Sequence, residues 1–218
     1  MLRILPHFAS LTASALIGGL LLPLTANAIT FVEVGDAGDQ PGSAQVVSGV
    51  TPLTAIQGTL GAGDIDMFRI HLNGGAFSAT VGIGGDSQLF LFDSTGRGLL
   101  ANDDIAFPSI SRSGISGSLP EGDYFLAISE FDNDPLSAGG LIFPNSPFDA
   151  ILGPTGPGGA SPIIGWSAFT GPGFGYQIDL VNASSVPTDP GQGVPDESSS
   201  LVLMALSGIA LFLVRRRA

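Results

Sequence analysis

Hydrophobic and polar residues alternate in several short segments of the middle of the chain. The segment 76–84, AFSATVGIG, has hydrophobic side chains at every second position: Phe77, Ala79, Val81 and Ile83. The segment 67–72 repeats the pattern, with Phe68, Ile70 and Leu72 on one face. A period of two residues is the signature of a strand with one buried face. Both segments are therefore predicted strands.

Further strands are separated by turn residues. The apolar runs 89–92 and 98–101 flank Asp-Ser-Thr-Gly, which predicts a hairpin. Residues 122–129 and 175–183 predict two more strands. No window of a dozen residues between positions 29 and 194 has helical spacing of its hydrophobic residues. Short strands with turn signals between them favour an all-β fold, an antiparallel β-sandwich or barrel.

The segment 135–175 interrupts this regular pattern. It is rich in glycine and proline, which argues against long strands, yet it carries many large hydrophobic residues. We expect an irregular insert that lies on the sandwich, with a short strand near 163–166. The predicted domain spans residues 29–183, and the polar, proline-containing residues 184–193 predict a linker.

The first 28 residues have the layout of a secretory signal peptide. Arg3 and His7 precede an apolar run over residues 11–24, and Ala26 and Ala28 are the small residues that a signal peptidase reads. The alternative is a transmembrane anchor, but Pro23 interrupts the run, which is shorter than the ~20 residues a bilayer requires. We expect signal peptidase to cleave this helix, so that the mature chain begins near Ile29.

The strongly acidic composition limits the kinds of ligand that the protein is expected to bind. Residues 29–194 contain 17 acidic residues against three arginines, and the whole chain has no lysine and no cysteine. Such an acidic surface repels phosphates, which argues against nucleic acid binding, and it is compatible with divalent cations. Without cysteine there is neither a disulfide nor a thiolate metal site.

Catalytic chemistry has little support in the sequence. Once the signal peptide is removed, His71 is the one remaining histidine, and no G-x-S-x-G nucleophile motif accompanies it. A surface histidine is the simpler interpretation. Paired carboxylates suit a glycoside hydrolase, but they also arise by chance in so acidic a chain. We therefore expect a protein that is not an enzyme. A cryptic glycan hydrolase ranks third, after the two candidate functions given at the end of this section.

Acidic and amide residues gather at the predicted strand ends and turns. These groups are Asp36 with Asp39, Asp64 with Asp66, residues 102–104 and residues 132–134. Calcium is bound by six to eight oxygens, often where loops meet. The alternative is that these side chains initiate turns and protect sheet edges from aggregation. No strict D-x-[DN]-x-[DN]-G loop decides between the two.

Three stretches together resemble the bacterial pre-peptidase C-terminal domain family. They are VGDAGDQPGSAQ (34–45), IQGTLGAGDIDMFRIHL (56–72) and DSQLFLFDSTGRGLLANDD (86–104), the last followed by LPEGDYFLAIS (119–129). The resemblance implies a jelly-roll-like antiparallel β-sandwich, of a kind that accompanies secreted enzymes. Some members bind Ca²⁺, and by position the resemblance implies a site made of Glu33, Asp36, Asp39, Asp64 and Asp66.

The chain ends VPDESSSLVLMALSGIALFLVRRRA (194–218). The apolar residues 201–214 would span about 21 Å as a helix, and residues 198–214 about 25 Å, which is marginal against a hydrocarbon core of ~30 Å. A plain C-terminal transmembrane anchor is the alternative interpretation. The cluster of Arg215, Arg216 and Arg217 would hold this end in the cytoplasm.

This tail resembles the PEP-CTERM class of sorting signals. The motif 194–197, with Val194, Pro195 and Asp196, precedes a transmembrane helix over 198–214 and the arginine cluster 215–217. The resemblance implies recognition by an exosortase, transient insertion into the inner membrane and removal of the tail. It also implies a Gram-negative bacterium that makes exopolysaccharide.

These observations together predict an exported, exosortase-sorted, non-catalytic β-sandwich protein of the cell surface or the extracellular polysaccharide matrix. The alternative is a calcium-dependent carbohydrate-binding module in that matrix.

Overall fold

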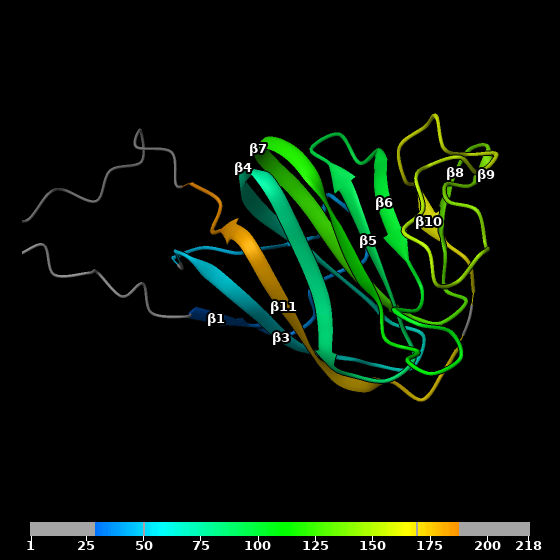
Figure 1. Cartoon of the computed structure of the whole chain (residues 1–218), viewed down its shortest axis with the longest axis horizontal. Helices are drawn as coiled ribbons and strands as arrows, with labels where there is room; N and C mark the ends of the chain where they lie inside the picture. The colour runs from blue at the N-terminus through cyan, green and yellow to red at the C-terminus, as the bar shows by residue number, and fades with distance from the viewer. Residues whose placement is uncertain (1–28, 50, 169, 188–218) are drawn as a thin grey trace, which may run out of the picture.

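The computed structural model describes residues 29–49, 51–168 and 170–187, and within these ranges the chain is all-β with no helix (Figure 1). The strands are β1 (Ile29–Val32), β2 (Gln45–Val46), β3 (Leu53–Leu60), β4 (Ile65–Ile83), β5 (Ser87–Asp93), β6 (Gly98–Asn102), β7 (Gly114–Glu130), β8 (Pro135–Ser137), β9 (Gly140–Leu141), β10 (Gly165–Trp166) and β11 (Phe174–Ser184). The all-β prediction is confirmed. None of the described residues forms a helix that is long and apolar enough to cross a membrane.

One mixed sheet folds over itself into a sandwich-like body. Its strand order is β1-β3-β11-β4-β7-β5-β6, and β2 pairs with β4. The two long strands, β4 and β7, pair with each other along most of their length and curve strongly, so that both layers share them (Figure 1). The two segments predicted as separate strands, 67–72 and 76–84, are thus parts of the single strand β4.

Glycines in the middle of β4 make this curvature possible. Gly74 and Gly75 have φ angles of 77° and 91°, a left-handed region that disfavours residues with a Cβ. Before the bend, even-numbered residues such as Phe68 and Ile70 face the main core, and after it odd-numbered residues such as Phe77 do. The bend therefore keeps both halves of β4 directed at one hydrophobic core.

The predicted antiparallel pairing holds for most of the sheet and is wrong for two pairs. β1 pairs with β3 in parallel, and so does β2 with β4. Both short strands belong to the first part of the described chain. Residues 33–44 connect β1, beside β3, to β2, beside β4. Hydrogen bonds fix this path: the Met67 amide donates to the Gly38 carbonyl (3.0 Å), and the Val47 amide donates to the Arg69 carbonyl (3.0 Å).

A second hydrophobic cluster lies between the sheet and the segment after β7. Phe90 and Phe92 of β5 pack against Phe143 at ring-centroid distances of 5.8 and 6.2 Å, and Trp166 of β10 lies 5.4 Å from Phe90. Met67, Ile142 and Ile163 belong to the same cluster. Burial of these side chains anchors the glycine- and proline-rich segment, which also forms a small sheet of order β10-β8-β9.

The two described ends of the chain emerge at the same pole of the sandwich, opposite β8, β9 and β10 (Figure 1). The Thr54 hydroxyl donates to the Ile29 carbonyl (3.1 Å), and the Val186 amide donates to the Val47 carbonyl (2.9 Å). The predicted signal peptide with Ala26 and Ala28 lies outside the described residues. The sorting signal 194–218 lies outside them too.

Candidate metal centre

Three carboxylates, two from loops and one from β4 itself, meet at the start of β4. Asp36 follows β1, Asp64 lies in the turn between β3 and β4, and Asp66 is the second residue of β4. Each offers one oxygen, and the three oxygens lie within 4.8 Å of one another. Two oxygens that bind one Ca²⁺ at 2.3–2.6 Å lie at most about 5 Å apart. The spacing of these carboxylates therefore suits a calcium ion.

Local turn chemistry positions the two outer carboxylates. The Gly38 amide donates to Asp36 Oδ1 (2.8 Å), and the Gly61 amide donates to Asp64 Oδ2 (3.0 Å). The Ile65 amide donates to Asp64 Oδ1 (2.9 Å). Aspartate commonly stabilises turns by accepting bonds from nearby amides. Each oxygen keeps a second lone pair that can bind a cation.

Asp66 is the buried member of the cluster. Its exposed fraction is 0%, the Tyr176 hydroxyl donates to its Oδ2 (2.6 Å), and its Oδ1 has no hydrogen-bond partner. The pKa of Asp66 is raised to about 8, chiefly by burial; the Tyr176 hydrogen bond lowers it, and the negative charges of Glu33 and Asp64 raise it. Burial and the charge of Asp66 also raise the pKa of Tyr176. An isolated carboxylate in this position needs a proton or a cation.

No basic side chain supplies that positive charge. The described residues contain three arginines, and each is engaged elsewhere: Arg69 with Asp123, Arg97 with the Ala160 carbonyl and Arg112 with the Gly82 carbonyl. The orphaned buried oxygen and the unbalanced charge of three neighbouring carboxylates together fit a bound divalent cation.

Glu33 supports the cluster without being one of its three carboxylates. Its Oε1 accepts from the Ala37 amide (3.1 Å), and its Oε2 accepts from the Thr59 amide (2.9 Å). A Cβ at Gly58 would collide with the Glu33 carboxylate and with the Tyr176 hydroxyl, so the absence of a side chain at Gly58 permits this close approach. Glu33 thus fixes the loop that carries Asp36.

Asp39 is exposed and is not part of the three-carboxylate cluster. Its carbonyl oxygen accepts a 2.7 Å hydrogen bond from the Trp166 indole nitrogen. Of the five predicted ligands, the structure therefore brings together Asp36, Asp64 and Asp66, places Glu33 beside them and uses the backbone of Asp39 to hold the insert.

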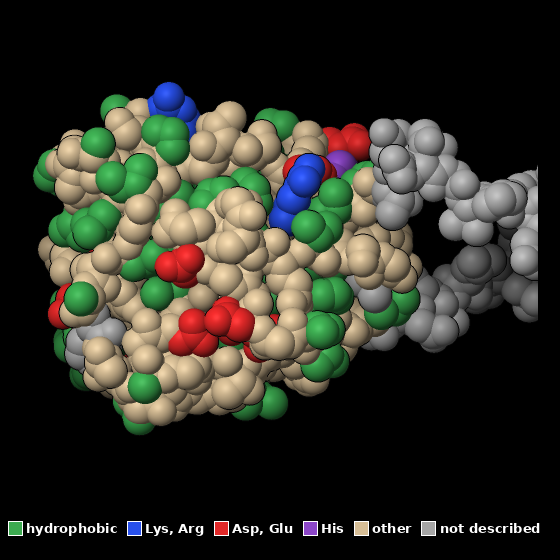
Figure 2. Space-filling view, turned by 180° about the vertical axis from the view of Figure 1, so that it is seen from behind, with side chains coloured by type: hydrophobic (Ala, Val, Ile, Leu, Met, Phe, Trp, Pro, Cys, Tyr) green, Lys and Arg blue, Asp and Glu red, His purple; other side chains and the backbone are tan. Residues whose placement is uncertain are grey.

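A second group of titratable residues lies on the polar face of β4 and β7. Asp123 accepts from Arg69 Nη2 (2.7 Å) and from His71 Nδ1 (2.8 Å), and His71 Nε2 lies 3.8 Å from Glu121 Oε1. Figure 2 shows the histidine beside an arginine and acidic side chains, apart from the acidic side chains near the middle of the same face. The Ser184 hydroxyl, across the ladder from His71, donates to Asn73 Oδ1 instead of to the imidazole (3.0 Å). This arrangement is an ion-pair network.

Asp86, Asp103 and Asp104 form another carboxylate cluster, in which Asp86 was not a predicted member. The acidic run at 102–104 was a signal for it, but the sequence contains no local cue that brings Asp86 to these residues.

No protein-family model matches the chain, and no curated protein matches it. The resemblances of the sequence motifs and of the tail accordingly stay predictions.

Proposed function

We propose that this chain is an exported, exosortase-sorted, non-catalytic protein of the cell surface or extracellular polysaccharide matrix, with a jelly-roll-like β-sandwich stabilised by calcium. Asp36, Asp64 and Asp66 would hold the ion, and water would complete its coordination. The observation that supports this proposal is the buried Asp66 carboxylate, whose Oδ1 lacks a partner beside two further carboxylates.

A cation at this cluster would connect three parts of the body. Asp36 lies in the loop after β1, Asp64 and Asp66 flank the start of β4, and Tyr176 of β11 is hydrogen-bonded to Asp66. The chain has no cysteine, so a disulfide cannot make such a connection. Extracellular calcium modules commonly work at dissociation constants of about 10⁻⁴–10⁻³ M, which suits a calcium-rich exterior.

Calcium binding is tested on the full chain, purified in mild detergent and stripped with a chelator. We expect calorimetry to show calcium binding and the melting temperature to rise with Ca²⁺, because a ligand that binds only the folded state stabilises it by about 1.4 kcal/mol at tenfold excess over Kd. Asp66→Asn should lose this ion. Asp39→Asn is the matched control and should retain it. Absence of heat and of any thermal shift in the parent protein would remove the calcium proposal.

Sorting is tested separately by mass spectrometry of the mature protein from cells with and without the exosortase. We expect removal of residues 1–28 and of the Arg215–Arg217 end in the presence of the enzyme. An extracellular form that still carries Arg217 would refute processing of the tail.

A calcium-dependent carbohydrate-binding module is a second candidate, supported by exposed aromatic residues. Phe107 is 58% exposed, and its ring lies 5.5 Å from that of Phe148, which in turn lies 6.0 Å from the ring of Phe131. Exposed apolar patches commonly mark interaction sites. Calcium-dependent retention on the native polysaccharide, lost in Phe107→Ala and kept in Ile164→Ala, would favour this candidate. Turnover of the polysaccharide would favour the hydrolase alternative.

A further inference from the structure

A second carboxylate cluster lies at the open end of the β5–β6 hairpin, opposite its turn. Asp86 comes immediately before β5, and Asp103 and Asp104 come immediately after β6. One oxygen from each lies within 4.8 Å of the others. The antiparallel pairing of Leu89 with Asn102 brings the beginning of one strand to the end of the other. No residue of this cluster belongs to the Asp36, Asp64 and Asp66 site.

Hydrogen bonds from several segments hold this cluster in place. The Asp104 amide donates to the Phe148 carbonyl (2.9 Å). Asn102 Nδ2 donates to the carbonyls of Asp104 (2.9 Å) and Ala150 (3.1 Å), and Asn102 Oδ1 accepts from the Gly114 amide (2.8 Å). The backbone that carries Asp103 and Asp104 is therefore tied to the insert and to β7.

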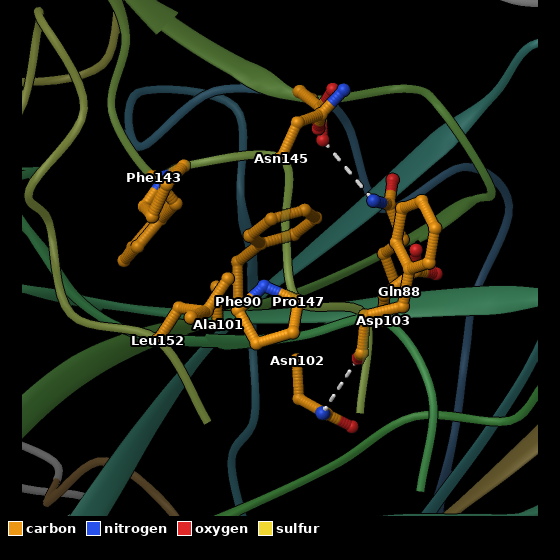
Figure 3. Close-up of a pocket in the computed structure, with 12 residues that line it drawn as sticks. Gln88, Phe90, Ala101, Asn102, Asp103, Phe143, Asn145, Pro147 and Leu152 are labelled. Carbon is orange, nitrogen blue, oxygen red and sulfur yellow. Dashed lines mark hydrogen bonds between the residues drawn. The ribbon is translucent and has the colours of Figure 1, made fainter. Parts of the chain in front are cut away.

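Asp103 supplies an observation independent of the clustering. Its exposed fraction is 8%, and its Oδ1 is buried without a hydrogen-bond partner. Figure 3 shows Asp103 beside a cavity that Gln88, Phe90 and Pro147 also line. The volume of this cavity is about 20 Å³. That is room for one water molecule. Asp86 and Asp104 do not line this cavity, so it adjoins the carboxylate cluster only through Asp103.

Another orphaned oxygen belongs to the short connection between β7 and β8. Asn133 is 1% exposed, and its Oδ1 has no partner. Its neighbour Asp134 lines the same cavity and accepts from Gln88 Nε2 (3.1 Å). A buried polar atom without a partner is uncommon in proteins, so each of these two oxygens requires an explanation.

Negative charge accumulates here without a basic partner. The pKa of Asp103 is raised to about 7, first by burial and then by the charges of Asp104, Asp86, Asp134 and Asp132. Burial also raises the pKa of Asp86 and of Asp104. Within the described part of the chain, the salt bridges of up to 4.0 Å involve only Arg69 and His71. Arg112, which borders a groove with Asp86, donates its Nη1 to the Gly82 carbonyl (2.7 Å).

We propose that Asp86, Asp103 and Asp104 bind a second divalent cation of the calcium class. The buried Asp103 carboxylate, one oxygen of which lies within 4.8 Å of an oxygen of each of the other two, would be its central ligand. Carboxylate oxygens at this spacing suit Ca²⁺, and water would complete the six to eight ligands that the ion takes. The ion would join the start of β5, the end of β6 and, through Asn102 and Phe148, the insert.

The test is the stoichiometry of calcium binding to the full chain in mild detergent, measured by equilibrium dialysis after chelator treatment. The parent protein should bind two ions. Asp103→Asn should bind one, Asp66→Asn should bind one, and the double variant should bind none. Asp179→Asn, which removes an exposed carboxylate of β11, is the matched control and should bind two.

Failure of this proposal is distinguishable from failure of the first site. If Asp103→Asn is folded and binds as many ions as the parent, the second site does not exist. If Asp66→Asn changes nothing while Asp103→Asn loses an ion, the first site is wrong and the second stands.

A second variant guards against misfolding of Asp103→Asn. Asp86 is exposed, so Asp86→Asn should fold and should bind the second ion at least tenfold more weakly. Unchanged affinity in Asp86→Asn would overturn the proposal. Melting temperatures give a further check: without calcium, Asp103→Asn should melt higher than the parent, because an uncompensated buried acid is removed, and added calcium should raise its melting temperature less.

Discussion

The Tyr176 hydroxyl donates a 2.6 Å hydrogen bond to Asp66 Oδ2, joining residues 110 positions apart in the chain. Both side chains are buried. The bond connects the last long strand, β11, with the start of β4, and it leaves Asp66 Oδ1 directed at no protein partner. One carboxylate thus has a structural oxygen and an oxygen that is free for a cation.

This relationship makes Tyr176→Phe informative. A hydrogen bond to a charged group contributes about 1.5–3 kcal/mol, more than a bond between neutral groups. We expect Tyr176→Phe to lower the free energy of unfolding by about 2 kcal/mol in urea titrations with calcium present. Tyr124→Phe is the matched control, because the Tyr124 hydroxyl donates to the neutral Pro120 carbonyl (3.0 Å) and its loss should cost about 1 kcal/mol. Equal costs would contradict the special role of Tyr176.

Because of the bend in β4, replacing Gly75 by a residue with a Cβ should destabilise the protein through backbone conformation alone. A Cβ there would have room, since its nearest neighbour would be Asn182 Nδ2 at 3.9 Å, but φ is 91°. We expect Gly75→Ala to lower the free energy of unfolding by about 1–3 kcal/mol. Gly153→Ala, with open space and no left-handed φ, should not lower it. Chemical unfolding of both variants measures the difference, and a Gly75→Ala protein as stable as the parent would contradict the strain.

Asp123 predicts a loss of stability in acid. Burial raises the pKa of Asp123, but hydrogen bonds from His71 and Arg69 outweigh it and hold the pKa below the ordinary value of 3.8. A carboxyl whose folded pKa is lower than its unfolded pKa stabilises the fold above the unfolded value, and this contribution disappears as pH falls through the folded pKa. Melting temperatures of the parent should therefore drop from about pH 5 downwards more steeply than those of Asp123→Asn. Asp39→Asn should follow the parent; identical slopes for Asp123→Asn and the parent would exclude this linkage.

Phe143 anchors the insert on the sheet. It is buried between Phe90 and Phe92, and replacement of a buried phenylalanine by alanine typically costs about 3–5 kcal/mol. We expect Phe143→Ala to destabilise the protein by that amount and to speed limited proteolysis within residues 144–162. Ile164 is 67% exposed, so Ile164→Ala should change the free energy of unfolding by no more than about 0.5 kcal/mol. It should leave the rate of proteolysis unchanged. Proteolysis at the same rate in both variants would show that the insert is held elsewhere.

The local sequence pattern predicted the positions of strands, but it predicted neither their full extent nor which strands pair with one another. The alternation at 67–72 and 76–84 identified buried positions of β4, but it did not show that one continuous strand contains both segments. Glycine permits either a chain reversal or a bend within one strand, and only the pairing with β7 decides between them. The parallel pairing of β1 with β3 has no local sequence signal, because it depends on contacts distant in the chain.

The candidate site was predictable to the extent that its residues lie in recognisable motifs. Asp64 and Asp66 lie in one motif and Asp36 in another, and both motifs carried the resemblance to a known family. Tyr176 and Gly58 were not identified as site residues, since their roles depend on a close approach that the fold creates. Asp86 was missed for the same reason: its partners are 17 and 18 positions away and reach it through the β5–β6 hairpin.

The shared pole of Ile29 and Val186 has a mechanical consequence. Any tether attached beyond either end would pull from the same side, so the sandwich would stand upright on its attachment point. The insert and the exposed Phe107 and Phe131 would then face outward, away from the supporting surface, and many copies side by side would present them as a uniform outer layer.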